Sequence, residues 1–230
     1  FGLQIYFDFS AYSHMAIGIS NIIGLPIMEN FNFPYNSKSA SEFWKRWHIS
    51  LSNWVSDYLY SFIKNNSSQF FYGALPLLST WIIMGIWHGA SLRFALWGLL
   101  NGFLILIHRL FKSNIKIKNN FLLNNCFWFI NLFSLMSTWI YFRSSTWDQA
   151  NTLFLKLFKI NDFSLSFREN YYLFVFLFMI TNLLIGNYKE YFDIKKFKDK
   201  KLINISLSSI ALALSIIFIN RQTSFIYFQF

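Results

Sequence analysis

The stretch Met-Gly-Ile-Trp-His-Gly-Ala-Ser, residues 84–91, decides how this chain folds. It places an ionisable residue, His88, at the end of an uncharged apolar run over residues 70–87, which is long enough to enter a bilayer. An ionisable side chain at membrane depth is costly and usually faces a partner or a water-filled cavity. Gly85 and Gly89 flank the histidine, and glycine lets other backbone or a ligand approach closely. The stretch therefore predicts an imidazole displayed inside a membrane.

The composition of the chain is that of a membrane protein. Of its 230 residues, 55% are hydrophobic, 13% are charged and 30 are phenylalanine, far beyond the usual content of a soluble domain. The net charge is +10, but the basic residues lie in short loops between apolar runs, which argues against a nucleic-acid partner. Cys126 is the only cysteine, so no internal disulfide can form, and no Cys/His metal pattern occurs. We predict one integral membrane domain that binds neither nucleic acid nor a metal ion.

Six apolar runs have the length of full or partial membrane spans. They cover residues 3–25, 70–87, 92–108, 121–142, 171–186 and 202–219. We therefore expect an all-α fold, a polytopic integral membrane helix bundle with about six membrane segments.

Loop charge predicts the orientation of these segments. Residues 109–118 and 188–201 are rich in Lys and Arg, so both loops are expected on the cytoplasmic side, with residues 143–170 outside. The chain starts inside an apolar run and without an initiator methionine. We interpret residues 1–230 as the C-terminal portion of one membrane domain whose N-terminal helices are missing.

Residues 41–63 predict an amphipathic helix that lies in the membrane interface or is partly re-entrant. Ser39 and Glu42 have the spacing of a capping box at its start. At helical spacing one stripe of the helix is polar, formed by Glu42, Arg46, Asn53 and Asp57. The opposite face is aromatic and aliphatic, and His48 lies on the flank between the two.

Histidines are the residues best suited to chemistry here, because no familiar nucleophile or nucleotide-binding motif is present. His88 is either a reactive group or a structural histidine bonded to a backbone carbonyl at a helix end. His48 is either a second reactive group or an interfacial histidine beside the snorkelling side chains of Lys45 and Arg46. Asp8 and His14, in the first apolar run, are interpreted as structural hydrogen-bonding groups.

Three segments resemble the membrane-bound O-acyltransferase family. They are Trp-Lys-Arg-Trp-His-Ile-Ser-Leu at residues 44–51, Asp-Tyr-Leu-Tyr at 57–60 and Gly-Ile-Trp-His-Gly-Ala-Ser at 85–91. Within that family, the chain is most similar to the membrane subunit of bacterial alginate O-acetyltransferases, whose relatives include the D-alanyl transferases of teichoic acid. Glu-Asn-Phe-Asn-Phe-Pro-Tyr at residues 29–35 is also similar to that branch. One departure is His14, which stands where relatives usually carry an acid.

The resemblance implies a multi-helix fold with a tunnel that brings an acyl donor to two polar positions, matched here by His88 and His48. We expect His88 to act as general base on an acceptor hydroxyl. We expect His48 to steady the thioester oxygen as charge develops, or to orient His88. Lys45 and Arg46 are expected to hold phosphates of the donor. The residues predicted to contact substrates are Trp44, Lys45, Arg46, Asn53, Asp57 and Trp87.

The resemblance also implies the partners and the location. The donor would be acetyl-CoA or another acyl thioester, used as a substrate, with no bound cofactor. The acceptor would be an exported polysaccharide, reached directly or through a periplasmic acetyltransferase-type partner protein. The location would be the bacterial inner membrane, where a multi-pass protein contacts lipid. Three alternatives stay open: D-alanyl transfer to teichoic acid, a proton-coupled membrane transporter, and a passive scaffold for a periplasmic partner.

Overall fold

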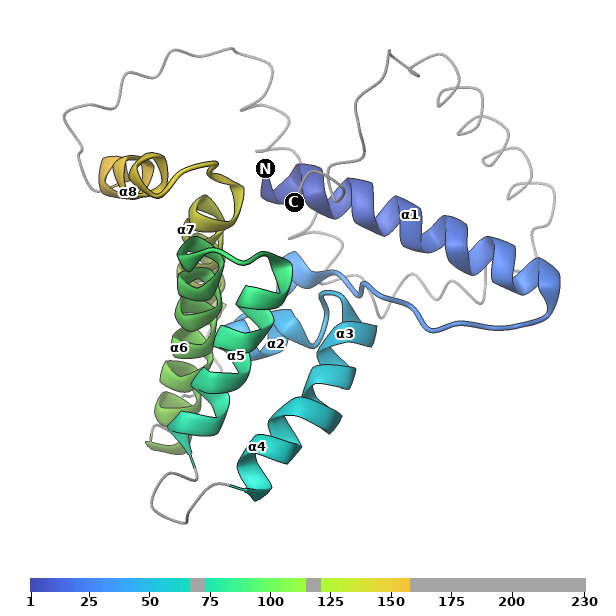
Figure 1. Ribbon diagram of the computed structural model, residues 1–230, viewed down its shortest axis with the longest axis horizontal. Coiled ribbons are helices and arrows are strands. Elements are labelled where there is room, and N and C mark those ends of the chain that lie inside the picture. Colours follow the sequence, from blue (N-terminus) through green and yellow to red (C-terminus); the bar gives the residue numbers. More distant parts are fainter. Residues whose placement is uncertain (67–72, 115–120, 158–230) are drawn as a thin grey trace. The chain divides into compact units, whose positions relative to one another are not determined.

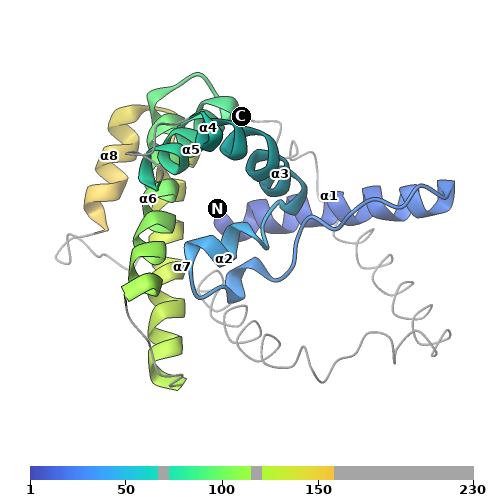
Figure 2. The ribbon, with the colours of Figure 1, turned by 90° about the horizontal axis from the view of Figure 1, so that it is seen from below.

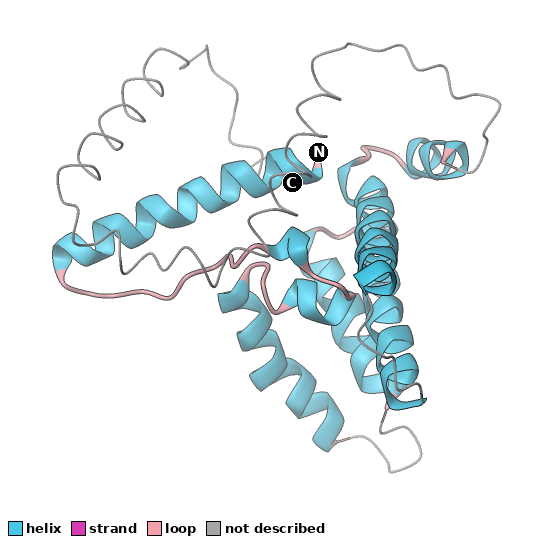
Figure 3. Ribbon diagram, turned by 180° about the vertical axis from the view of Figure 1, so that it is seen from behind, coloured by secondary structure: helices cyan, strands magenta, loops and turns pink. Residues whose placement is uncertain are grey.

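A computed structural model of the protein describes residues 1–66, 73–114 and 121–157. The chain divides into two compact units, Phe1–Ser166 with Phe230, and Phe167–Gln229; all described residues belong to the first. These residues form helices joined by loops (Figure 3), apart from one isolated bridge between Phe31 and Trp47. The predicted all-α class is confirmed for this part of the chain. The predicted runs at residues 171–186 and 202–219 lie outside it.

Each of the four apolar runs within the described residues is a helix (Figure 1). Among the described helices, the stretch Leu92–Phe111 alone is long and apolar enough to cross a membrane, and a shorter apolar helix covers Ala74–His88. The predicted count of about six membrane segments is therefore not confirmed. The four helices are α1 (Gly2–Ile23), α5 (Ala74–His88), α6 (Leu92–Asn114) and α7 (Phe121–Arg143), and α8 (Trp147–Lys156) follows them.

Helices α5 and α6 lie side by side because two glycines let their backbones touch. A Cβ atom added to Gly85 would collide with the carbonyl oxygen of Phe94. One added to Gly98 would collide with the carbonyl oxygen of Trp81. The close approach of other backbone that the sequence predicts at Gly85 is confirmed. It fixes the C-terminal end of α5, where His88 lies.

The continuous helix predicted over residues 41–63 is wrong. The chain forms α2 (Ala40–Trp44), turns, and continues as α3 (Ile49–Trp54), the π-helix η2 (Val55–Tyr60) and α4 (Ser61–Asn65). His48 has φ 44°, a left-handed conformation through which a helix cannot continue. The predicted helix start is confirmed, because the Ser39 hydroxyl accepts a 3.2 Å hydrogen bond from the backbone N–H of Glu42.

The loop between α1 and α2 is tied to two helices through one tyrosine. Tyr35, in the short 3₁₀ helix η1 (Pro34–Asn36), is buried and donates its hydroxyl to the carbonyl oxygen of Gly2. Its own carbonyl oxygen accepts a 2.6 Å bond from the indole of Trp128 in α7. The loop therefore has a fixed course, and that course carries Asn30 to the turn at His48.

A buried asparagine joins three helices. Asn101, in α6, is fully buried, and its side-chain oxygen accepts a 3.2 Å bond from the indole of Trp44 in α2. Its amide donates to the carbonyl oxygen of Trp97 at 2.8 Å and to the hydroxyl of Thr138, in α7, at 3.2 Å. Both polar atoms of the side chain are satisfied, which a buried amide requires. The network holds α2 against α6 (Figure 2) and positions the turn that carries His48.

Candidate active site

His88 is the last residue of α5, and three aromatic rings surround its imidazole. The centroid of the Trp97 ring, from α6, lies 5.3 Å away, and that of Phe142, from α7, lies 5.1 Å away. The ring of the neighbouring Trp87 lies 4.8 Å away. Among the described residues, His88 has no hydrogen-bond partner, so the alternative of a carbonyl-bonded structural histidine gains no support. The imidazole is only partly buried.

His48 lies in the turn between α2 and α3, outside the long apolar helices. The ring of Phe9, from α1, meets it edge-on with centroids 4.7 Å apart. Its Nδ1 atom lies 3.3 Å from Oδ1 of Asn30 and 3.4 Å from the hydroxyl oxygen of Ser50. Burial lowers the pKa of His48 to about 4, because a charged imidazole is poorly solvated there. The ring is therefore neutral at pH 7.

The fold brings the two predicted catalytic histidines together. The imidazoles of His48 and His88 interact electrostatically, so a charge on one disfavours a charge on the other. Aromatic contacts connect their surroundings. Trp47, beside His48, meets Trp139 at 5.1 Å, and Trp139 meets Phe142, which covers His88, at 5.9 Å. The pair thus combines two ionisable rings with a largely aromatic setting.

His14 does not belong to this pair. His14 is exposed, and its Nδ1 lies 2.7 Å from the carbonyl oxygen of Ser10, one turn earlier in α1. The bond lies within one helix, and a structural hydrogen bond of His14 is what the sequence predicts. No group of three His, Cys, Asp or Glu side chains that fits a metal ion occurs in the described ranges.

Two cavities border α5. The first, here called the polar cavity, has a volume of about 220 Å³ and is lined by side chains that include Trp44, Lys45, Asn53 and Arg109. The second, the apolar cavity, has a volume of about 420 Å³, and apolar and aromatic side chains, Trp87 among them, line it. Val55 and Met84 line both, so the two cavities share a wall made by η2 and α5.

Four of the six predicted substrate contacts line these cavities, and two do not. Trp44, Lys45 and Asn53 line the polar cavity, and Trp87 lines the apolar one. Arg46 instead forms a 2.6 Å ion pair with Glu42, one turn earlier, and donates to the carbonyl oxygen of Asn32 at 3.4 Å. Asp57 is exposed in η2 and is absent from the lining of both.

Arg109 is a cavity residue that sequence reasoning missed. Its guanidinium lies over the ring of Tyr60, 5.7 Å from the centroid, and donates to the tyrosine hydroxyl at 3.4 Å. The basic loop that begins at this residue was used only to predict orientation. Because the side chain also lines the polar cavity, it lies with Lys45 on the wall of one site.

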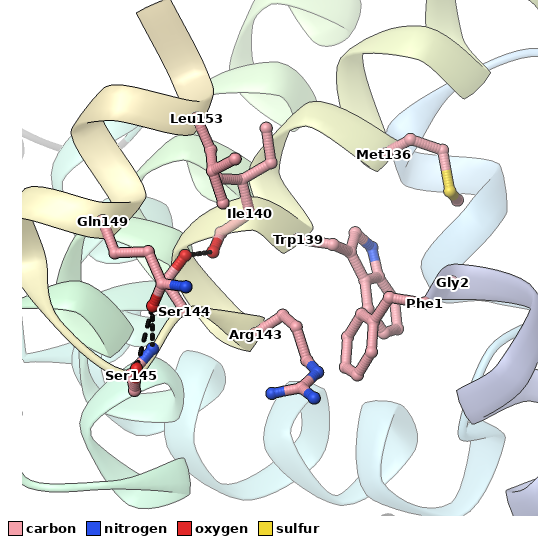
Figure 4. A pocket seen from close by; sticks show the side chains of 10 residues that line it. All are labelled: Phe1, Gly2, Met136, Trp139, Ile140, Arg143, Ser144, Ser145, Gln149 and Leu153. Carbon is pink, nitrogen blue, oxygen red and sulfur yellow. Dashed lines mark hydrogen bonds between the residues drawn. The ribbon is translucent and has the colours of Figure 1, made fainter. Parts of the chain in front are cut away.

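A further cavity of about 530 Å³ lies where the start of α1 meets the turn between α7 and α8 (Figure 4). Figure 4 shows the side chain of Arg143 beside Phe1 and Trp139, and the guanidinium carbon lies 5.7 Å from the centroid of the Phe1 ring. Neither His48 nor His88 lines this cavity. The histidines do not line the two cavities beside α5 either, but Trp87, which lines the apolar cavity, directly precedes His88 in α5 and contacts its ring. For that reason we take the histidine pair with the two cavities beside α5 as the candidate active site.

Comparison with known proteins assigns the chain to a family. Residues 1–143 match the model of the family described as "MBOAT, membrane-bound O-acyltransferase family". "Probable alginate O-acetylase AlgI" of Azotobacter vinelandii is 40% identical over 163 residues, which are 71% of this chain and 32% of that protein. "Peptidoglycan O-acetyltransferase" of Helicobacter pylori is 34% identical over 166 residues, 72% of this chain and 31% of that protein.

A third relative has a different printed activity. "Teichoic acid D-alanyltransferase" of Bacillus subtilis is 35% identical over 129 residues, 51% of this chain and 32% of that protein. The chain thus spans about a third of the length of the curated relatives it matches, with matched shares of 31–32%. Both candidate histidines fall within the part that matches the family model. The chain belongs to the membrane-bound O-acyltransferase family.

Proposed function

We propose that this chain is part of a membrane-embedded O-acyltransferase that moves acetyl groups from a thioester donor toward an exported polysaccharide. The transfer is direct or passes through a periplasmic acetyltransferase-type partner. The names of the alginate and peptidoglycan relatives support an O-acetyl transfer to a cell-envelope polysaccharide. The observation that carries the proposal is the pairing of His48 and His88 in one aromatic setting.

His88 is the proposed general base. A hydroxyl is a poor nucleophile until its proton leaves as the new bond forms, and a neutral imidazole takes that proton. The acceptor oxygen bonds to the thioester carbonyl carbon, the carbon–sulfur bond breaks, and the proton passes from the imidazole to the leaving thiolate. Apolar rings around His88 favour its neutral, basic form. Such a base contributes roughly 10²–10⁴-fold to the rate.

The aromatic surroundings serve the same reaction by keeping water from the thioester. Water competes with the acceptor hydroxyl for the activated acyl group, and a dry site limits that loss. Trp97, Trp139 and Phe142 are all buried. They come from α6 and α7, so the packing of these helices maintains the dry site.

The polar cavity is the proposed site for the phosphates of the donor. Lys45 and Arg109 line it together with Asn53 and Tyr60, and no Asp or Glu is among the described residues that do so. Two cations without a carboxylate attract a phosphate, and the serine and asparagine side chains add hydrogen-bond donors. Arg46 is not part of this proposal, since its guanidinium is held by Glu42.

The proposed setting is the bacterial inner membrane, crossed by about six segments of this chain. The family and the apolar helix α6 support a membrane location. The proposed partners are membrane lipid, the acyl donor, a periplasmic acetyltransferase-type protein and the exported polysaccharide.

Acetyl transfer is tested with the full-length protein in proteoliposomes that receive acetyl-CoA labelled in the acetyl group. An acyltransferase consumes the thioester and places the label on the polysaccharide or the periplasmic partner. A transporter moves label across the vesicle wall and leaves the thioester intact. A scaffold does neither, and either of these results overturns the proposal.

D-alanyl transfer is a second candidate function, favoured by the similarity to the teichoic acid D-alanyltransferase. The same vesicles, supplied with a labelled D-alanyl thioester and teichoic acid, measure it. Preference for D-alanyl over acetyl groups would replace the acetyl donor in the proposal and leave the role of His88 unchanged.

A further inference from the structure

We propose that Asn30 is a positioning residue that fixes the proton of His48 on Nδ1, so that Nε2 offers a lone pair to the reaction. The catalytic meaning of this inference rests on the proposed function. The position of the proton follows from the hydrogen-bond geometry alone. Asn30 lies in the loop between α1 and α2, and nothing in the periodicity of the sequence connects it with His48.

The backbone of Ser50 determines which way the Asn30 amide faces. The backbone N–H of Ser50 is an obligatory donor, and it lies 3.2 Å from Oδ1 of Asn30. The atom at that place must therefore be the amide oxygen and not the amide nitrogen. The amide nitrogen then points to the hydroxyl of Ser13 in α1, 3.5 Å away.

The same oxygen determines the tautomer of His48. The hydroxyl oxygen of Ser50 lies 2.6 Å from Oδ1 of Asn30. Because an amide oxygen cannot donate, the hydroxyl of Ser50 is the donor in this bond, and its single proton points to Asn30. Nδ1 of His48 thus has two neighbours that act as acceptors, Oδ1 of Asn30 at 3.3 Å and the hydroxyl oxygen of Ser50 at 3.4 Å. Nδ1 forms a hydrogen bond with either only as a donor. The neutral ring therefore carries its proton on Nδ1.

Asn30 also holds the backbone that presents the ring. Its carbonyl oxygen accepts a 2.9 Å bond from the N–H of Ile49, directly after His48. His48 has φ 44°, a conformation that costs a residue other than glycine energy and persists where surrounding contacts hold it. One residue therefore fixes both the position and the protonation of this imidazole.

The position of this proton distinguishes the two roles predicted for His48, which are to steady the thioester oxygen and to orient His88. A neutral ring with its proton on Nδ1 has no N–H left on Nε2, so Nε2 cannot donate to a developing oxyanion. It accepts a proton or a hydrogen bond, from the acceptor hydroxyl or from His88. Burial keeps the ring in this neutral form, since the pKa of His48 is lowered to about 4. The groups that face His48 are His88, Phe9 from α1 and Asn30 with Ser50 from the adjoining loop and helix.

Nitrogen NMR of the full-length protein labelled with ¹⁵N-histidine reads the tautomer without any reaction. The His48 signals are identified by their loss in His48→Gln. We expect a protonated Nδ1 and an unprotonated Nε2 at pH 7, and mixed tautomers in Asn30→Ala. A proton on Nε2, or an unchanged tautomer in Asn30→Ala, overturns the inference. This readout stands even if acetyl transfer, and with it the proposed function, is not observed.

Two substitutions separate positioning from mere folding. Asn30→Asp keeps an acceptor at Nδ1 and adds a negative charge, which raises the pKa of His48 by about 1–3. The acid limb of the kcat/KM profile should move to higher pH accordingly.

Asn30→Ala should lower kcat by about tenfold or more. Asn66→Ala is the matched control, because Asn66 is exposed and bonds to its own helix turn; it should leave the tautomer and the pH profile unchanged. Equal losses in Asn30→Asp and Asn30→Ala, with no movement of the limb, contradict the inference.

Discussion

The indole nitrogen of Trp44 donates a 3.2 Å hydrogen bond to the side-chain oxygen of Asn101, and this bond joins α2 to α6. Trp44 ends the helix that precedes the His48 turn. Asn101 belongs to the helix that packs against α5, at whose end His88 lies. The bond therefore connects the two elements that bring the histidines together.

Replacing Asn101 with alanine should destabilise the protein. The buried indole N–H of Trp44 and the hydroxyl of Thr138 would each lose a partner, and an unpaired buried group costs about 1–3 kcal/mol. Thermal unfolding of the purified full-length protein should show a clearly lower Tm. Asn66→Ala is the matched control, because Asn66 is exposed and bonds only to its own helix turn. Equal Tm values for the two variants would show that the network does not hold α2 in place.

Alanine at Gly85 or Gly98 should force α5 and α6 apart. Each added methyl group meets a backbone carbonyl, which cannot rotate away, and overpacking of this kind costs about 1–3 kcal/mol or more. The Tm should fall, and acetyl transfer should fall with it because His88 is displaced from Trp97 and Phe142. Gly18→Ala in α1 has open space for its methyl group and should leave both quantities near the wild-type values. A stable, active Gly98→Ala protein would disprove the close contact.

Neutralising the polar cavity should weaken donor binding. A hydrogen bond to a charged group contributes about 1.5–3 kcal/mol, so Lys45→Gln and Arg109→Gln should each raise the KM for acetyl-CoA about tenfold or more. Arg46→Gln removes the same charge but should leave the KM near the wild-type value, because its guanidinium is engaged by Glu42. If Arg46→Gln raises the KM and Arg109→Gln does not, the phosphate site has been placed on the wrong residues.

The stability of the protein should depend on pH through His48. In the unfolded chain this residue takes up a proton near pH 6.5, whereas in the folded protein its pKa is about 4. Between these values the unfolded state binds more protons, so acidification favours unfolding, by up to about 3 kcal/mol at pH 4, and no further below it. His48→Gln should therefore lose less stability than the wild type between pH 7 and pH 4. Parallel losses in the two proteins would contradict the lowered pKa.

The sequence predicts those features that depend on local pattern. Apolar runs predict α1, α5, α6 and α7, and spaced glycines predict the contact between α5 and α6. The sequence context singles out His88 at the end of an apolar run, whereas His48 is singled out by the resemblance to the membrane-bound O-acyltransferases, and the fold places the two residues together.

Features that depend on contacts between residues far apart in the sequence could not be predicted from it. The turn at His48 is bonded to Asn30, which reaches it from another loop, whereas helical spacing alone predicts one continuous helix. The place of Arg109 in the polar cavity depends on the packing of α6 near Lys45 and Tyr60. For Arg46 a local signal did exist: Glu42 precedes it by four residues, a spacing that favours an ion pair over a free cation.

The central claim is that the imidazole of His88 removes the proton of the acceptor. Single-turnover acetyl transfer by the full-length protein, with the acetyl donor preloaded and the acceptor then added, measures that step most directly. His88→Ala with wild-type membrane insertion and Tm should react about 10²–10⁴-fold more slowly than the wild type. A folded and inserted His88→Ala protein that transfers acetyl groups at the wild-type rate would contradict the claim.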